Sequence, residues 1–188
     1  MLWKLIAWIV SRAPVANWII RRAQRTPYYP ITSRDGSELY MDRWWLFNPY
    51  GKGPNNETLP ARWDWLPSVR VHHILRADDD EHLHDHPWDA RTIVMRGWYQ
   101  EEQPVDSLTT RHFAMTNFEK GLQWRQRHER TRGYTGAVKF NQFHRIAEVS
   151  PGGVFTLWFT WKYQGTWGFD VDGKKVPYKT YLAERPRA

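Results

Sequence analysis

The chain has 188 residues, of which 41% are hydrophobic and 25% are charged, and its formal net charge is +7. These proportions exclude a disordered chain and fit a globular protein of about one domain with a substantial core. The chain has no cysteine, which excludes disulfides, thiolate metal ligands and cysteine nucleophiles, so any bound metal must be held by His, Asp or Glu.

The positive charge comes with no recognisable nucleic-acid-binding motif. Basic residues are scattered, with short clusters at residues 21–25 and 125–132, but no basic helix motif, zinc finger or RNA-recognition signature accompanies them. The charge therefore indicates a solvated positive surface, and nucleic-acid binding is the less favoured interpretation.

The first 25 residues predict a helix in two pieces, divided near Pro14, because proline disfavours the helical conformation of the residue before it. In the second piece, Val15, Trp18 and Ile19 share one face with Arg22. We expect this stripe to pack on the body of the protein. Contact with a partner or with a membrane surface is the alternative.

Residues 1–10 do not make a convincing targeting signal. They lack a charged n-region, Lys4 interrupts the apolar run, and no small-residue cleavage pattern precedes Arg12. The apolar run is also far shorter than the roughly 20 residues that span a bilayer. We therefore expect a cytoplasmic protein.

From residue 28 onward the pattern is typical of β-structure. Asp35-Gly36 signals a tight turn, residues 48–60 read as a loop, and Gly97 marks a turn or bulge. The predicted strands cover residues 38–47, 69–76, 91–100, 136–149 and 154–161, with a weaker strand at 111–118 and a final hairpin within 167–182.

Seven or more short strands after one helical segment predict a mainly β fold, a barrel or a sandwich. We expect two parts, an amphipathic helical segment over residues 1–27 and a β-barrel domain over residues 28–188.

The most informative stretch runs from Glu81 to Asp89. It places His82, His84 and His86 at alternate positions, and on an extended strand side chains two residues apart point to the same face. Two imidazoles at this spacing can hold one metal ion.

The pattern His84-x-His86-Pro87-Trp88, followed by Gly97 and later by a lone His144, resembles the cupin superfamily. More narrowly, it resembles small cupin-like proteins of bacteria and bacterial viruses that share a His-Asp-His-Pro-Trp run. The resemblance covers residues 38–182 approximately. It implies a double-stranded β-helix, or jelly-roll barrel, in which His84, His86 and His144 hold one divalent metal ion (Fe, Mn, Ni or Zn).

The resemblance also implies a small-molecule ligand and a homodimer. The corresponding function is that of a mononuclear metal enzyme, of dioxygenase-like, isomerase or hydrolase type, acting on a small polar ligand. The alternative is a non-catalytic barrel that binds a ligand or a partner. The tryptophans Trp88, Trp98, Trp158 and Trp167 are candidates for the pocket wall.

The chain departs from the cupin pattern at Ala90, where the pattern has a glutamate. Asp89 is adjacent to this position but has the wrong strand parity, unless a bulge turns it inward. The open alternatives are a three-histidine site and a shifted register made of His82, His84 and Asp89, in which Asp takes the place of the glutamate. We expect Asp85 or Asp89 to hold the second nitrogen of an imidazole.

The remaining titratable groups are read as structural or solvated. Glu101-Glu102 is most simply a solvated strand edge. Among the other histidines (His72, His73, His112 and His128) we single out His73, because it would share an inward face with Val71 and Leu75.

Overall fold

The computed structural model of the chain describes residues 1–33, 36–55, 57–105 and 125–184. The helices are α1 (Leu2–Val10), α2 (Ala13–Ala23) and α4 (Tyr178–Glu184). The strands are β1 (Pro27–Thr32), β2 (Leu39–Phe47), β3 (Tyr50–Lys52), β4 (Thr58–Ala61), β5 (Ser68–Ile74), β6 (Leu83–His84), β7 (Trp88–Arg96), β8 (Trp98–Pro104), β9 (Arg125–Thr131), β10 (Thr135–Val138), β11 (Arg145–Val149), β12 (Val154–Tyr163), β13 (Gly168–Val171) and β14 (Lys174–Pro177).

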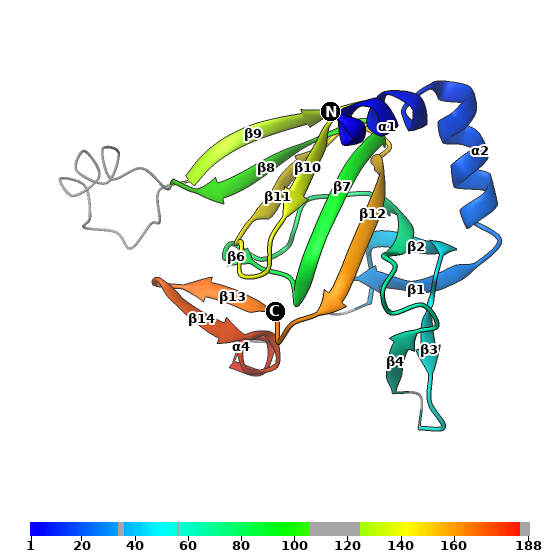
Figure 1. The fold of residues 1–188 in the computed structure, drawn as a ribbon. Helices are drawn as coiled ribbons and strands as arrows, with labels where there is room; N and C mark the ends of the chain where they lie inside the picture. Colours follow the sequence, from blue (N-terminus) through cyan, green and yellow to red (C-terminus); the bar gives the residue numbers. More distant parts are fainter. Residues whose placement is uncertain (34–35, 56, 106–124, 185–188) are drawn as a thin grey trace.

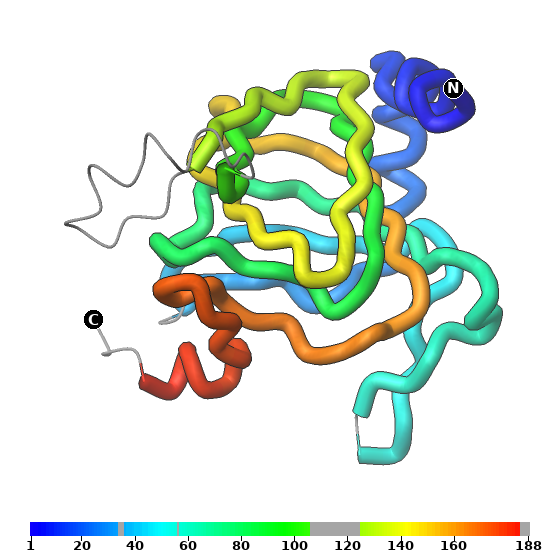
Figure 2. Tube along the Cα trace, turned by 60° about the vertical axis from the view of Figure 1, so that its left-hand side comes forward, coloured from blue at the N-terminus to red at the C-terminus, as the bar shows by residue number. Residues whose placement is uncertain are grey.

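Two antiparallel sheets face each other and enclose the core of the barrel (Figure 1 and Figure 2). The larger has the order β1-β2-β5-β12-β7-β10, and the smaller has the order β11-β8-β9. One buried cluster joins them, since it contains Met41 and Ile74 from the larger sheet and Tyr99 and Ile146 from the smaller one. The predicted fold class is confirmed: a mainly β, jelly-roll barrel preceded by an α-helical segment.

A third sheet, of order β14-β13-β6, carries the histidine run against the barrel. His84 in β6 pairs with Phe169 in β13 on one side. On the other side His84 forms an isolated antiparallel bridge with His144. This short sheet therefore brings the early histidines to the later one, which lies 60 residues further along the chain.

The helices α1 and α2 cover the outer face of the larger sheet (Figure 1). The residues of α2 buried there are Ala16, Ile19, Ile20 and Ala23, and Val15 packs against the same cluster. The predicted packing of α2 on the protein body is therefore confirmed for Val15 and Ile19, whereas Trp18 and Arg22 of the predicted stripe are exposed. The small alanines let the helix approach the sheet closely, and the bulky Trp18 ring is 63% exposed. The division of the chain at residue 27 stays a prediction.

Three predicted segments differ from the structure. The expected loop over residues 48–60 contains the β3–β4 hairpin, whose strands are too short to show an alternating pattern. The expected single strand region over residues 136–149 is split into β10 and β11, with Asn141 between them at a φ of 62°. The last segment leaves β-structure at Tyr178 for α4, where Leu182, Ala183 and Glu184 are good helix formers.

Two other predictions concern residues outside the described ranges. The weak strand at residues 111–118 lies wholly outside them, as does Asp35 of the predicted Asp-Gly turn. No described helix is both long and apolar enough to cross a bilayer.

Gly97 makes the tight connection between β7 and β8, as the sequence predicts. Its φ is +80°, in the region that favours glycine. A Cβ atom there would lie 2.5 Å from Ser150 Oγ and 2.7 Å from the carbonyl oxygen of Gly153. The glycine therefore lets the β7–β8 turn pack directly against the turn before β12.

Candidate metal centre

A cavity of about 500 Å³ lies between the two sheets, and the histidine triad forms part of its wall. Its aromatic wall includes the predicted Trp88, Trp158 and Trp167, whereas Trp98 does not contribute. The polar side chains that line it are Thr32, Arg43, Arg70, His72, Asp78, Asp79, Asp80, His84, His86, Thr92, His144, Thr156 and the tyrosines 40 and 99.

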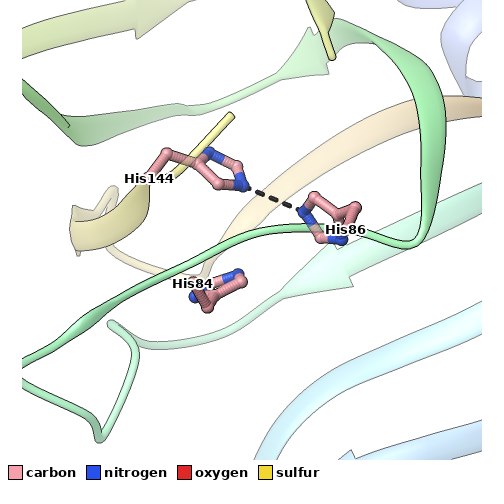
Figure 3. Close-up of side chains that lie close together, drawn as sticks. All are labelled: His84, His86 and His144. Atoms are coloured by element: carbon pink, nitrogen blue, oxygen red, sulfur yellow. Dashed lines mark hydrogen bonds between the residues drawn. The ribbon is translucent and has the colours of Figure 1, made fainter. Parts of the chain in front are cut away.

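The three histidines of the candidate triad, His84, His86 and His144, point toward a common point (Figure 3). One ring nitrogen from each lies within 4.8 Å of those of the other two. The Nε2 atoms of His86 and His144 are 2.9 Å apart. Reciprocal backbone hydrogen bonds between His84 and His144, of 2.8 and 2.9 Å, fix the two chain segments to each other.

Glu101 holds His144 from behind. Its Oε1 atom lies 2.7 Å from His144 Nδ1, and its Oε2 atom accepts a hydrogen bond of 2.8 Å from Arg130 Nε. Burial opposes ionisation of this carboxyl group, but the hydrogen bonds and charges of His144 and Arg130 outweigh it and lower the pKa to about 2. An ionised carboxylate only accepts, so Nδ1 of His144 carries the hydrogen and its Nε2 atom faces the cavity.

The interpretation of Glu101-Glu102 as a solvated edge was therefore wrong. Glu101 is 2% exposed and Glu102 is 8% exposed. The two-residue period of β8 was the signal available in the sequence, because it places Glu101 on the same face as the buried Tyr99.

His84 and His86 have imidazole rings that are neutral and can donate a lone pair to a metal ion. Burial is the main cause that lowers the pKa of His84, and the nearby Asp78 partly opposes it. Burial is also the main cause that lowers the pKa of His86 well below its ordinary value. The nearby His144 and His84 lower it further. Neutral imidazoles offer the free lone pair that metal binding needs.

Asp78 supports the His84 side of the triad. One of its carboxylate oxygens, Oδ2, lies 3.6 Å from His84 Nδ1 and accepts a hydrogen bond of 2.8 Å from the backbone N–H of Ile146. The hydroxyl of Tyr40 donates to the other oxygen. The carboxylate is thus held at a fixed place beside the imidazole.

The carboxylates predicted to support an imidazole, Asp85 and Asp89, form hydrogen bonds and ion pairs elsewhere. Asp85 is fully buried, accepts a hydrogen bond of 2.7 Å from the Gly168 N–H and pairs with Lys175. Asp89 accepts a hydrogen bond from the Phe140 N–H at 3.0 Å. Neither contacts a ring of the triad, and this prediction was wrong because the supporting groups come from distant segments.

The side chains of the shifted register, His82, His84 and Asp89, do not converge on one point. His82 Nδ1 lies 2.9 Å from the Tyr181 hydroxyl, away from the triad. Ala90, which stands where the cupin pattern has a glutamate, is buried beside Trp88 and Trp158. Among the described residues, the grouped metal-ligating side chains are His84, His86 and His144 alone.

The face of β5 that lines the cavity is the one opposite to the face predicted from the sequence, on which we singled out His73. His72 lines the cavity, whereas the ring of His73 stacks on Phe155 with centroids 3.9 Å apart. His73 Nε2 also lies 2.9 Å from the Gly152 carbonyl oxygen. Both faces of β5 are buried, so burial pattern alone could not tell which histidine faces the cavity.

The geometry of the triad fits a divalent metal ion. With metal–nitrogen distances of about 2.1 Å, two ligands at right angles stand about 3 Å apart, close to the 2.9 Å between His86 and His144. Three imidazole ligands suit Fe, Mn, Ni or Zn.

Comparisons with known proteins give structural similarity only. No protein-family model matches the chain, and no curated protein sequence matches it. The narrower resemblance to cupin-like proteins of bacteria and bacterial viruses therefore stays a prediction.

Three similar solved structures illustrate the level of likeness. Hydroxypropylphosphonic acid epoxidase from S. wedmorenis is 9% identical, with a TM-score of 0.40 over 65% of this chain and 51% of that one. An oxalate decarboxylase variant from Bacillus subtilis is 12% identical, with a TM-score of 0.45 over 85% and 32%. Vicilin from Corylus avellana (hazelnut) is 11% identical, with a TM-score of 0.45 over 85% and 36%.

The chain thus spans about half or less of the length of each of these three structures. Similarity at this level does not assign a function, and the fold description rests on the sheet topology given above.

Proposed function

We propose that His84, His86 and His144 bind one divalent metal ion and that the cavity holds a small polar substrate beside it. The observation that carries this proposal is the convergence of three ring nitrogens within 4.8 Å of one another. A buried carboxylate fixes one of these rings in the tautomer that binding needs. The arrangement supports a mononuclear metal enzyme of dioxygenase-like, isomerase or hydrolase type.

In such a site a bound metal ion polarises a substrate oxygen or activates water. The protein's own contribution is positioning and exclusion of solvent. Glu101, itself held by Arg130, keeps His144 oriented. Asp78 keeps its place beside His84 through the backbone of Ile146. The apolar side chains around the triad, among them Ile74, Ile146, Trp158 and Phe169, lower the local polarity and strengthen electrostatic interactions.

Metal analysis of purified protein tests the binding step. The wild-type chain should hold a single ion, and His84→Ala, His86→Ala and His144→Ala should each lose most of it. The matched controls are His82→Ala and His73→Ala, since these histidines have other partners. Equal metal content in the triad variants and the wild type would refute the proposal. Loss of metal in His82→Ala and His84→Ala, with metal retained in His86→Ala, would favour the shifted register.

Turnover separates an enzyme from a non-catalytic binding module. Dioxygen uptake by the iron-loaded protein with candidate thiols or phenols would indicate an oxygenase-like enzyme. Tight binding of a ligand without turnover under any metal would favour the binding module instead.

A separate observation supports a membrane-surface contact for α1 and α2, and we propose an anionic lipid surface as the partner. Several large apolar side chains of these helices are exposed, namely Leu2, Leu5, Trp8, Ile9 and Trp18. Residues 1–34 contain Lys4 and five arginines but no Asp or Glu. Apolar and cationic groups together favour the interface of anionic bilayers.

Vesicle co-sedimentation tests this contact. The full chain should bind phosphatidylglycerol vesicles more strongly than phosphatidylcholine vesicles, and Trp8→Gln with Trp18→Gln should abolish the binding. Trp65→Gln is the matched control, because Trp65 is 75% exposed but lies outside the helices. Equal binding of all variants, or none by the wild type, would contradict the proposal.

A further inference from the structure

We propose that the ligand of this cavity carries an anionic oxygen group, a carboxylate or a phosphate, and that Arg70 binds that group. The inference rests on the proposed function, because it assigns a substrate class to the same cavity. It is carried by a buried cation that the described part of the protein leaves without an oxygen partner.

Arg70 is almost completely enclosed, with an exposed fraction of 2%. Its Nε and Nη2 atoms are buried and have no hydrogen-bond partner among the described residues. No described carboxylate forms an ion pair with it, and acidic groups that line the cavity have other partners, such as Tyr40 for Asp78 and Arg76 for Asp79. Buried charges in proteins are normally paired, so an unpaired one that lines a cavity suggests a partner from outside the chain.

Four aromatic rings surround the guanidinium group. The Cζ atom of Arg70 lies between 5.2 and 5.8 Å from the ring centroids of Tyr28, Trp45, Tyr50 and Trp88. Ring faces attract a cation, but they leave its N–H donors without oxygen acceptors. The rings thus keep the group charged and in place, while its capacity to bind a planar or tetrahedral oxyanion in a two-pronged manner remains free.

Neighbouring polar groups add further anion-binding capacity at the Arg70 end of the cavity. His72 Nε2 and Trp88 Nε1 are also buried without a hydrogen-bond partner. Arg43 lies opposite His72 in the β2–β5 register and lines the cavity. Its Nε atom donates to the Tyr29 carbonyl, and it adds a second positive charge. A ligand that accepts several hydrogen bonds and is negatively charged would satisfy this set.

Two tryptophans connect this end to the triad. The ring of Trp88 has Arg70 Cζ 5.4 Å from its centroid and the His86 ring 6.4 Å away. Trp158 lies opposite Arg70 in the β5–β12 register, and its ring centroid is 5.1 Å from that of His86. One small molecule lying along these rings could therefore place its anionic group at Arg70 and its reacting part at the triad.

Calorimetric titration of the full chain, freed of metal with a chelator, tests the inference. The probes are benzoate, its neutral counterpart benzamide, and inorganic phosphate. Benzoate or phosphate should bind the wild type, and benzamide should bind at least about tenfold more weakly, the effect of one charged hydrogen bond. Stronger binding of benzoate would indicate a carboxylate ligand, and stronger binding of phosphate a phosphorylated one.

Variants locate the binding. Arg70→Gln should weaken anion binding about tenfold or more, and Arg70→Lys should restore only part of it because lysine lacks the planar fork. Arg76→Gln is the matched control, since Arg76 does not line the cavity and is paired with Asp79 and Glu38. Should Arg70→Gln fail to fold, the benzoate–benzamide difference in the wild type still decides.

His84→Ala keeps this test apart from that of the metal site. It should lose metal and retain anion binding, so each proposal can fail without the other. Equal affinity for benzoate and benzamide, unchanged anion affinity in Arg70→Gln, or no binding of either anion to the wild type would overturn the inference.

Discussion

The two faces of the larger sheet use the same strands for different purposes. On its outer face, Val71, Ile93 and Leu157 pack under the N-terminal helices in an apolar cluster. On its inner face, the neighbouring positions of the same strands carry Arg70 and Thr92. All of these positions are buried. Burial therefore does not distinguish the faces; the polarity of the buried groups does, and the polar face is the one that encloses a cavity.

The cavity itself has two different ends. At the triad, the supporting carboxylate of Glu101 has both oxygens engaged, by His144 and by Arg130. Around Arg70, buried donors have no partner among the described residues. Satisfied groups hold a structure in place, whereas unsatisfied ones are costly unless something else completes them. We infer that the first end is prepared for an ion and the second for a ligand.

The outer face should give the largest loss of stability. Leu157→Ala removes a side chain that is 2% exposed and leaves a void in the cluster beneath the helices. The expected loss in the free energy of unfolding is about 2–5 kcal/mol, measured by urea denaturation. Metal content per folded chain should not change, and a simultaneous loss of metal would show that the two faces are not independent.

The triad end of the cavity should respond in metal affinity instead. Glu101→Gln keeps the shape of the side chain but removes the charge that stabilises the His144 tautomer. Loss of such a supporting carboxylate typically lowers metal affinity about 10–100-fold, which corresponds to about 1.4–2.7 kcal/mol. Competition with a chromogenic chelator measures it.

Glu102→Gln is the matched control for that measurement. Glu102 is the next residue of the same strand, and it pairs with Arg125, Arg127 and Arg145 rather than with a histidine. Its replacement should leave metal affinity within about twofold of the wild type, because effects below about 0.5 kcal/mol are usual away from a site. Equal losses in the two variants would mean that Glu101 acts through general stability.

The sequence predicted the positions of the strands better than it predicted which face of each strand lines the cavity. Local patterns placed the buried strand at residues 154–161 and the turn at Gly97, because both depend on neighbouring residues. The mainly β class followed from the number of short strands, whereas the jelly-roll barrel was implied by the resemblance to cupins. In contrast, the choice between His72 and His73 depends on which side the helices cover, and a strand buried on both faces carries no periodicity that reveals it.

The candidate site was only half accessible to sequence reasoning. The spacing of His84 and His86, together with the resemblance to cupins that added His144, led to three rings that the structure brings together. Their supporting carboxylates did not follow, since Asp78 and Glu101 reach the rings through tertiary contacts and not through sequence proximity. The pairing of Glu101 with Arg130 likewise depends on the β8–β9 register.

The ionisation of Glu102 should produce a smaller, pH-dependent effect on stability. Burial alone would raise the pKa of this carboxyl group, but hydrogen bonds from Arg127 and Arg125 and the charge of Arg145 lower it below its ordinary value. Its stabilising contribution is then fully present above the pKa of an unfolded glutamate and is lost as the pH falls through the lowered, folded-state pKa.

Urea denaturation of wild type and Glu102→Gln from pH 7 to pH 3 measures this contribution. At pH 7 the wild type should be more stable by on the order of 1 kcal/mol, and the difference should shrink as the medium becomes acidic. The ionisation of Glu101 is common to both proteins and cancels in the comparison. A difference that grows toward low pH would contradict the assignment.

The smallest stability effect should come from the unpaired buried charge of Arg70. Arg70→Met replaces an unpaired cation by an apolar side chain that still fills the space between four rings. Replacing buried ionic groups by hydrophobic residues of similar size is often neutral or stabilising. Loss of the cation–ring attraction, up to about 2 kcal/mol at a desolvated site, should be offset by relief of the desolvated charge. We therefore expect the free energy of unfolding to stay within about 0.5 kcal/mol of the wild type or to rise. A loss as large as that of Leu157→Ala would instead make Arg70 a structural part of the aromatic cluster and would remove the reason to assign it to a ligand.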